Sequence, residues 1–267
     1  MIRKNIVWGA LLMAVAAGPA AAGPGQKVDF PLRGQTLSVK VYRPVGAPKG
    51  TILIGSGDVG WVGLSVSMSE YLSDRGYIVV GVNSRQYLSA FTDGKRHLEV
   101  HDPPSDFAAL RGLLERQGLL VPPVIVSGVS EGAALAVLAA SDSRNHAWID
   151  GVVTMGTPMV AALAWNWTDF TTWITKRDAN QPSFSPADFI AHISPVPLVM
   201  LQSVTDEYVP EADYRALHAT AKHPKRLVLI GASNHRFTDR QPELRAEMLN
   251  ALAWIAECAA KGTGGAQ

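Results

Sequence analysis

The stretch VIVSGVSEGAALAVL (residues 124–138) decides the fold of this chain. Its β-branched apolar start is typical of a buried strand, and its alanine- and leucine-rich end is typical of a helix. The pentapeptide 128–132 leaves little room between the two for anything but a sharp turn. We therefore expect strand, turn and helix in succession, with Ser130 at the apex of the turn.

The pentapeptide reads G-V-S-E-G, which fits the G-x-S-x-G pattern of a nucleophile elbow. Glycine is needed on both sides of the serine because a Cβ there would collide with neighbouring backbone. The turn is expected to hold Ser130 in a strained conformation. The helix that follows would direct its positive N-terminus at negative charge developing on a substrate. A turn that merely links two elements is the alternative, so the rest of the chain decides.

Apolar strands alternate with helices along the chain, which predicts an α/β fold with a doubly wound, mostly parallel sheet. Two alternating segments near the start, 28–30 and 36–42, predict an antiparallel N-terminal edge. The expected strands of the parallel sheet are 51–54, 77–82, 124–129, 149–155, 197–202 and 226–230. The expected helices include 64–75, 103–118, 211–220 and 242–260.

A serine hydroxyl needs a base to take its proton, and the base needs a carboxylate to orient it. In doubly wound hydrolases these residues follow the chain order Ser, Asp or Glu, His. Asp206 comes just after the strand 197–202, and His235 lies in the loop after the strand 226–230. Ser130, Asp206 and His235 are therefore the predicted catalytic residues.

Several other residues compete for these roles. Glu207 is the rival of Asp206, displaced by one residue. His192 and His223 precede strands and are expected at the opposite edge of the sheet. His97 and His101 precede the elbow in the chain, so their order argues against a catalytic role.

An oxyanion hole needs two backbone N–H groups. Glu131, directly after the serine, is expected to supply one. The glycine-rich loop 55–61 is expected to supply the other, from Asp58 or alternatively Val59, and Trp61 at its end is predicted to contact substrate. A phosphate-binding loop is the alternative, but neither a G-x-G-x-x-G motif nor a Walker lysine is present. The predicted mechanism uses no cofactor and no metal.

The segments SGDVGW (56–61) and VGVNSRQYL (80–88) resemble those of the AcvB/VirJ virulence-protein family. The resemblance covers the first half of the mature chain and implies the α/β-hydrolase fold and export to the periplasm. Some members of that family resemble hydrolases that release the amino acid from aminoacylated phosphatidylglycerol. The resemblance thus implies Ser130, Asp206 and His235 as the triad.

About forty residues rich in aromatic side chains separate the strands ending near residue 155 and beginning at 197. So long a connection is uncommon in a compact domain, and we interpret residues 157–194 as a small cap insertion. An ordinary core helix is the alternative. Trp165, Trp167 and Trp173 are expected to meet a lipid chain, and Arg85 is expected to meet a phosphate.

Acidic side chains occupy both predicted oxyanion positions, Asp58 and Glu131. A carboxylate there disfavours an oxyanion but would stabilise the ammonium group of an aminoacyl ester. The alternative is that both side chains point away from the site. The sequence thus predicts a serine esterase, with a general esterase for uncharged esters, or a non-catalytic binding or secretion-accessory protein, as the other interpretations.

Residues 1–22 combine a short positive region, an apolar run and a small-residue cleavage site, as in a secretory signal peptide. We expect a single domain over 23–267 that is periplasmic or secreted, with possible peripheral membrane contact. A net charge of +1 without a basic block argues against a nucleic-acid partner. The single cysteine, Cys258, cannot form an internal disulfide and is expected to be a packing residue.

Overall fold

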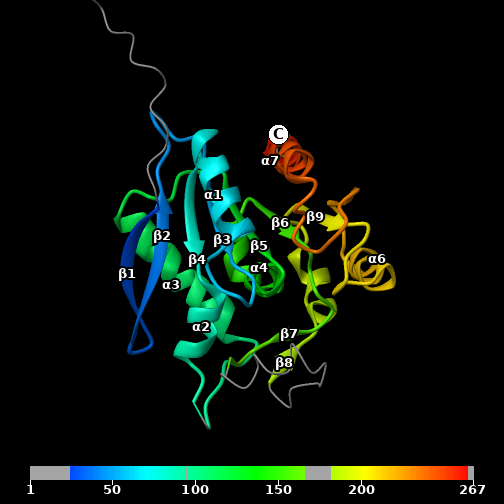
Figure 1. Cartoon of the computed structure of the whole chain (residues 1–267). Helices are drawn as coiled ribbons and strands as arrows, with labels where there is room; N and C mark the ends of the chain where they lie inside the picture. Colours follow the sequence, from blue (N-terminus) through cyan, green and yellow to red (C-terminus); the bar gives the residue numbers. More distant parts are fainter. Residues whose placement is uncertain (1–24, 94, 166–181, 264–267) are drawn as a thin grey trace, which may run out of the picture.

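The computed structural model describes residues 25–93, 95–165 and 182–263, and shows one central sheet with helices on both faces (Figure 1). The strand order is β1-β2-β4-β3-β5-β6-β9-β10. The strands are Gln26–Leu32 (β1), Gln35–Tyr42 (β2), Thr51–Gly55 (β3), Ile78–Val82 (β4), Val124–Val129 (β5), Gly151–Met155 (β6), Leu198–Ser203 (β9) and Lys225–Ile230 (β10).

The α-helices follow these strands in alternation, as the sequence predicts. They are Leu64–Asp74 (α1), Ser84–Ala90 (α2), Asp102–Arg116 (α3), Glu131–Ser141 (α4), Glu211–Thr220 (α6) and Gln241–Thr263 (α7). Sequence analysis missed only α2 among these. That helix is short, and the Asn83 side chain caps it by accepting a hydrogen bond from the Gln86 N–H.

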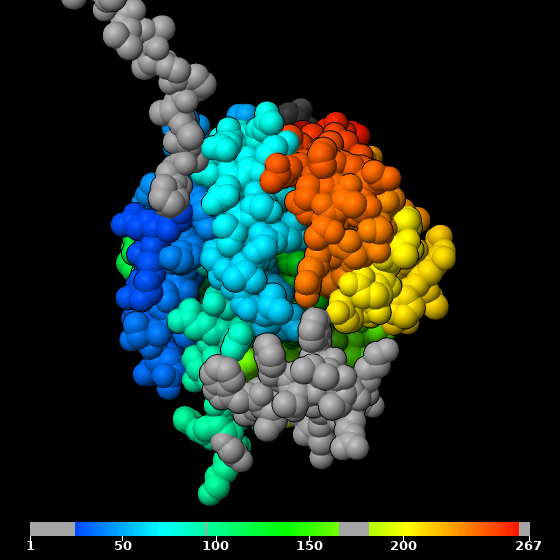
Figure 2. All heavy atoms as spheres, viewed as in Figure 1, coloured from blue at the N-terminus to red at the C-terminus, as the bar shows by residue number. Residues whose placement is uncertain are grey.

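The central strands β3, β4, β5, β6 and β9 are buried on both faces, so successive residues of one strand enter different cores. Ile52 and Ile54 of β3 pack with α1 and α7, whereas Leu53 between them packs with α3 and α4 on the other face. Figure 2 shows α1 and α7 lying over the near face. The helices thus hold the sheet rigidly and leave its carboxyl edge to carry a site.

The sheet topology determines where that site lies. The pairs β1–β2 and β2–β4 are antiparallel, which confirms the predicted edge, and the remaining neighbours are parallel. The chain places β4 on one side of β3 and β5 on the other. Ligands of open α/β sheets bind at such a switch point, beyond the carboxyl ends of the strands. The glycine-rich loop and the turn at Ser130 leave the sheet here.

The two described ends of the predicted cap insertion come together in space. Strands Ala161–Ala162 (β7) and Ser183–Phe184 (β8) form a small antiparallel sheet, and β7 contacts α4. Trp165 belongs to this stem, whereas Trp167 and Trp173 lie outside the described residues, as do residues 1–22. Within the described ranges, no helix is both long enough and apolar enough to span a bilayer.

Candidate active site

Ser130 lies at the sharp turn between β5 and α4, as the sequence predicts. Its backbone has φ 52° and ψ −115°, a region that residues with a side chain rarely adopt. Its N–H donates to the Met155 carbonyl at 2.9 Å, which fixes the apex against the neighbouring strand β6. The turn is therefore strained and held in place from the adjacent strand, as expected of a nucleophile elbow.

The elbow requires glycine because three backbones meet there without side chains between them. A Cβ on Gly132 would lie 2.3 Å from the Gly55 carbonyl carbon, and one on Gly128 would lie 2.1 Å from that of Gly132. Real Cβ atoms do not approach backbone so closely. The first turn of α4 can thus press against the end of β3, which brings the glycine-rich loop beside Ser130.

Asp206 and His235 meet at the carboxyl edge, beyond β9 and β10. The Asp206 Oδ2 atom lies 2.7 Å from His235 Nδ1 and accepts a second bond of 2.7 Å from Gln202 Nε2. Its Oδ1 accepts the N–H groups of Tyr208 and Val209, both at 2.9 Å. Burial raises the pKa of Asp206, but these hydrogen bonds and the His235 interaction outweigh it and lower the pKa overall. Asp206 is thus held as a carboxylate.

The other nitrogen of the same imidazole is available for chemistry. His235 is 7% exposed, and among the described residues its Nε2 has no hydrogen-bond partner. Gly156, with φ 62°, lies directly against the imidazole ring. A Cβ on Gly156 would lie 2.7 Å from His235 Cε1. Because Nδ1 faces a carboxylate, it carries the ring proton, and Nε2 is left as a base.

Ser130 and His235 line one cavity of about 440 Å³. Its walls come from the glycine-rich loop, the start of α1, the elbow, and the acid and histidine loops. Figure 2 shows cyan, orange and yellow parts of the chain next to one another on the near face of the molecule. The lining residues are Gly57, Asp58, Val59, Val62, Gly63, Leu64, Ser65, Val129, Ser130, Tyr208, His235 and Arg236.

The glycine-rich loop passes beside the nucleophile, where an oxyanion hole requires it. A Cβ on Gly57 would lie 3.8 Å from Ser130 Cβ. The Asp58 side chain accepts a hydrogen bond from the Val59 N–H at 2.9 Å. This bond already engages the Val59 N–H, and Asp58 stays the predicted second donor.

Glu131 directs its carboxyl group away from solvent, toward the stem of the insertion. Its Oε1 accepts a hydrogen bond from the Ala162 N–H at 2.6 Å. Burial raises the pKa of Glu131 to about 8; the Ala162 bond lowers it, and the charge of Asp58 raises it further. Glu131 is therefore mostly protonated at neutral pH. Among the described residues that line the cavity, Asp58 is the one acidic side chain.

Three further residues predicted to contact substrate, Trp61, Arg85 and Trp165, are not among the residues that line the cavity. The Trp61 indole packs where a Cβ of Gly81 would stand, and its Nε1 donates to the Tyr42 hydroxyl at 3.1 Å. Arg85 lies over the Trp165 ring, 4.2 Å from its centroid.

The histidines that compete with His235 for the catalytic role are all exposed: His97, His101, His192 and His223.

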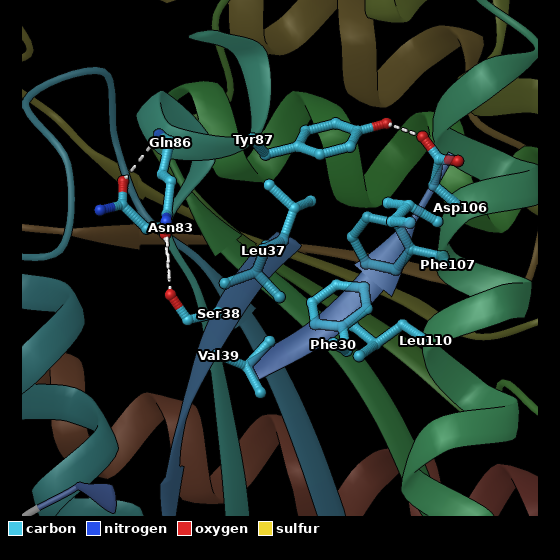
Figure 3. A pocket seen from close by; sticks show the side chains of 12 residues that line it. Phe30, Leu37, Ser38, Val39, Asn83, Gln86, Tyr87, Asp106, Phe107 and Leu110 are labelled. Atoms are coloured by element: carbon cyan, nitrogen blue, oxygen red, sulfur yellow. Dashed lines mark hydrogen bonds between the residues drawn. The ribbon is translucent and has the colours of Figure 1, made fainter. Parts of the chain in front are cut away.

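A second cavity lies between the β1–β2 edge, α2 and α3, and Figure 3 shows its lining. Its volume is about 20 Å³, room for about one water molecule. The buried Asp106 beside it binds the Tyr87 hydroxyl at 2.6 Å and the Arg33 guanidinium at 2.7 Å. This network anchors the N-terminal hairpin to α3 and offers no room for a substrate.

Sequence analysis missed three residues that shape the site. Gln202 supports Asp206, Gly156 leaves room for the imidazole, and Tyr208 packs edge-on against His235 with centroids 5.3 Å apart. Gln202 had a sequence signal, since an amide in an apolar strand four residues before an acid needs a polar partner. Gly156 and Tyr208 had no sequence signal, because His235, which both contact, is far away from them in the chain.

Serine hydrolases of the α/β-hydrolase fold are defined by three features: an α/β sheet, a strained serine at the elbow, and a carboxylate and a histidine that follow it in that chain order. Residues 63–262 match the model of the prolyl oligopeptidase family, and the chain belongs to that family. This match identifies the chain as a serine hydrolase. The AcvB/VirJ resemblance stays a prediction.

Solved structures agree in fold. The esterase domain of a Rhodothermus marinus protein is 21% identical, with a TM-score of 0.55 over 80% of this chain and 90% of that one. Est1E from Butyrivibrio proteoclasticus is 14% identical, with a TM-score of 0.63 over 86% and 99%. An alpha-beta serine hydrolase homologue from Coxiella burnetii is 19% identical, with a TM-score of 0.58 over 85% and 97%.

Curated relatives match only part of the chain. YfhR of Escherichia coli O157:H7, described as uncharacterized, is 37% identical over 71 residues, which are 26% of this chain and 25% of that protein. YfhR of strain K12 is 35% identical over 69 residues, or 25% and 24%. The matched stretch thus spans about a quarter of these relatives.

Proposed function

We propose that this protein is an exported serine hydrolase that cleaves a carboxylic ester through Ser130, His235 and Asp206. The observation that carries the proposal is the state of the His235 ring. Its Nδ1 is 2.7 Å from an Asp206 oxygen, while its Nε2 has no partner in the described part of the chain and shares a cavity with Ser130.

The reaction follows the usual two steps for this arrangement. Ser130 Oγ attacks the ester carbonyl carbon while His235 Nε2 takes its proton. The N–H groups of Asp58 and Glu131 stabilise the oxyanion. The ester C–O bond breaks, His235 returns the proton to the leaving alcohol, and an acyl-enzyme remains. Water, deprotonated by His235, then releases the acid and restores Ser130.

For the substrate we propose an aminoacyl ester of phosphatidylglycerol. Asp58 is the carboxylate that lines the cavity, and it can pair with the ammonium group beside the scissile carbonyl. Arg236, also in the lining, can pair with the lipid phosphate, a role for which the sequence favoured Arg85. Val59, Val62 and Tyr208 are 45%, 54% and 49% exposed and give the cavity an apolar rim suited to a lipid.

The apolar walls also favour a second substrate class, uncharged esters, and the comparison of substrates decides between the two. We expect Asp58→Asn to lower turnover of alanyl-phosphatidylglycerol roughly tenfold and to leave a neutral p-nitrophenyl ester nearly unchanged, because only the first substrate carries a cation. Steady-state kinetics of the wild type and Asp58→Asn on both esters measures this. A proline-containing peptide p-nitroanilide is added as a third substrate because the chain matches the prolyl oligopeptidase family.

Glu257→Gln on the exposed side of α7 removes the same charge away from the site and serves as the control. Equal effects of Asp58→Asn on both esters would contradict the aminoacyl-lipid proposal. A preference for the neutral ester in both proteins would leave a general esterase, and a preference for the peptide would leave a peptidase. A chain that reacts with neither substrate nor a fluorophosphonate would be a binding protein that keeps the fold.

Export rests on residues 1–22. We expect the mature protein to begin near Gly23, because signal peptidase cleaves after small residues. N-terminal sequencing of the protein from periplasmic and membrane fractions tests this. Recovery of Met1 in the membrane fraction would contradict cleavage and indicate an anchored protein.

A further inference from the structure

Two adjacent acidic residues of one turn hold His235 at two different points. Asp206 binds the imidazole, with Oδ2 2.7 Å from Nδ1. Glu207 turns to the main chain instead, and its Oε2 accepts the His235 backbone N–H at 2.8 Å. The rival carboxylate of the sequence therefore contacts the same histidine without touching its ring.

The main chain of His235 needs such an anchor because it lies in a loop beyond the end of β10. The loop is fixed mostly from within itself: Asn234 Oδ1 accepts the N–H groups of Arg236 and Thr238 at 3.1 and 3.3 Å. These bonds define its shape and not its place relative to Asp206. The Glu207 side chain connects the acid loop to the main chain of the histidine loop at His235 itself.

We propose that Glu207 is a positioning residue, which holds the backbone of His235 so that Nε2 stays in line with Ser130. This inference rests on the proposed function. The Asp206 bond fixes the ring end of His235 and the Glu207 bond fixes its main-chain end, so the residue as a whole cannot shift relative to the acid loop. Misplacement of a catalytic group by about 1 Å can cost roughly 10²-fold in rate.

The test compares Glu207→Ala with Glu207→Gln. The glutamine keeps an oxygen acceptor and loses the charge, whereas alanine loses both. Because Glu207 is exposed, water can replace the bond in the alanine variant and the fold should persist. We expect Glu207→Ala to lower kcat roughly 10- to 100-fold with little change in KM, and Glu207→Gln to stay within about threefold of wild type.

Two further measurements separate positioning from general damage. Hydrogen exchange at the His235 amide should be slow in the wild type and in Glu207→Gln, and faster in Glu207→Ala. Fluorophosphonate labelling of Ser130 should slow by the same factor as kcat. Glu211→Ala, on the first turn of α6, removes a nearby exposed carboxylate and should leave the labelling rate unchanged.

The outcomes are distinct. Wild-type kcat or wild-type amide exchange in Glu207→Ala would overturn the inference. Equal losses in the alanine and glutamine variants would also overturn it, because they would show that the charge matters and the hydrogen bond does not. If Ser130→Ala kept full activity, the proposed function itself would fail, whatever Glu207 did.

Discussion

Replacing Ser130 by alanine should reduce esterase turnover by roughly 10⁴- to 10⁶-fold, with little change in substrate binding. The hydroxyl supplies the nucleophile, and the other serine of the elbow strand, Ser127, is buried and is not among the residues that line the cavity. The helix N-terminus and the oxyanion N–H groups remain, so a small residual rate above the uncatalysed one is expected. Single-turnover and steady-state assays with a p-nitrophenyl ester measure the loss, and fluorophosphonate labelling should disappear with it.

Ser127 offers a matched control on the same strand. It is 1% exposed, and its hydroxyl has no hydrogen-bond partner among the described residues. Ser127→Ala also removes a hydroxyl oxygen, three residues before the nucleophile. Fluorophosphonate labelling and esterase turnover should both stay at the wild-type level in this variant. Retained hydrolysis in Ser130→Ala, with normal folding by circular dichroism, would refute the serine mechanism.

The elbow and the sheet could be predicted because their signals are local. The strand 124–129 is apolar throughout, since a parallel strand covered on both faces has no polar side. The same rule located the strand before Asp206, whereas the strand before His235 is partly exposed and was located by the alternation of strands and helices. Chain order then brought the predicted triad to one edge. The short helix α2 was missed because a seven-residue helix is too brief to show a hydrophobic period.

Side-chain direction could not be read in the same way. Glu131 and Asp58 are both acidic and both next to the predicted oxyanion donors, yet one carboxyl is buried against the insertion stem and the other lines the cavity. That difference depends on the Ala162 N–H, which lies 31 residues after Glu131. Arg85 was likewise predicted at a phosphate and lies over Trp165, because residues distant in the chain decide where a long side chain packs.

The raised pKa of Glu131 predicts a pH dependence of stability with a definite sign. The carboxyl has a pKa of about 8 in the folded protein and about 4.5 in the unfolded chain. Between these values the unfolded state has released the proton and the folded state still holds it. The free energy of unfolding therefore falls as pH rises from about 4.5 to 8, by at most roughly 5 kcal/mol at about 1.4 kcal/mol per pH unit.

Glu131→Gln isolates this contribution, because the amide keeps an oxygen for the Ala162 N–H and cannot ionise. Urea unfolding from pH 5 to 9 should show the wild type losing stability relative to Glu131→Gln up to about pH 8, with a constant difference above. Glu257→Gln, exposed on α7, should run parallel to the wild type. Parallel curves for Glu131→Gln as well would mean that the carboxyl is already ionised in the folded protein.

The ionisation of Glu131 should also change kcat. Glu131 follows the nucleophile directly and its N–H is the predicted oxyanion donor, so an ionised carboxylate at this position opposes the charge that develops on the substrate. We expect kcat of the wild type to fall as pH rises through about 8 and kcat of Glu131→Gln to stay level there, because only the wild type acquires the opposing charge. If kcat fell equally in both proteins as pH rises through about 8, the fall would belong to the ionisation of a group other than Glu131.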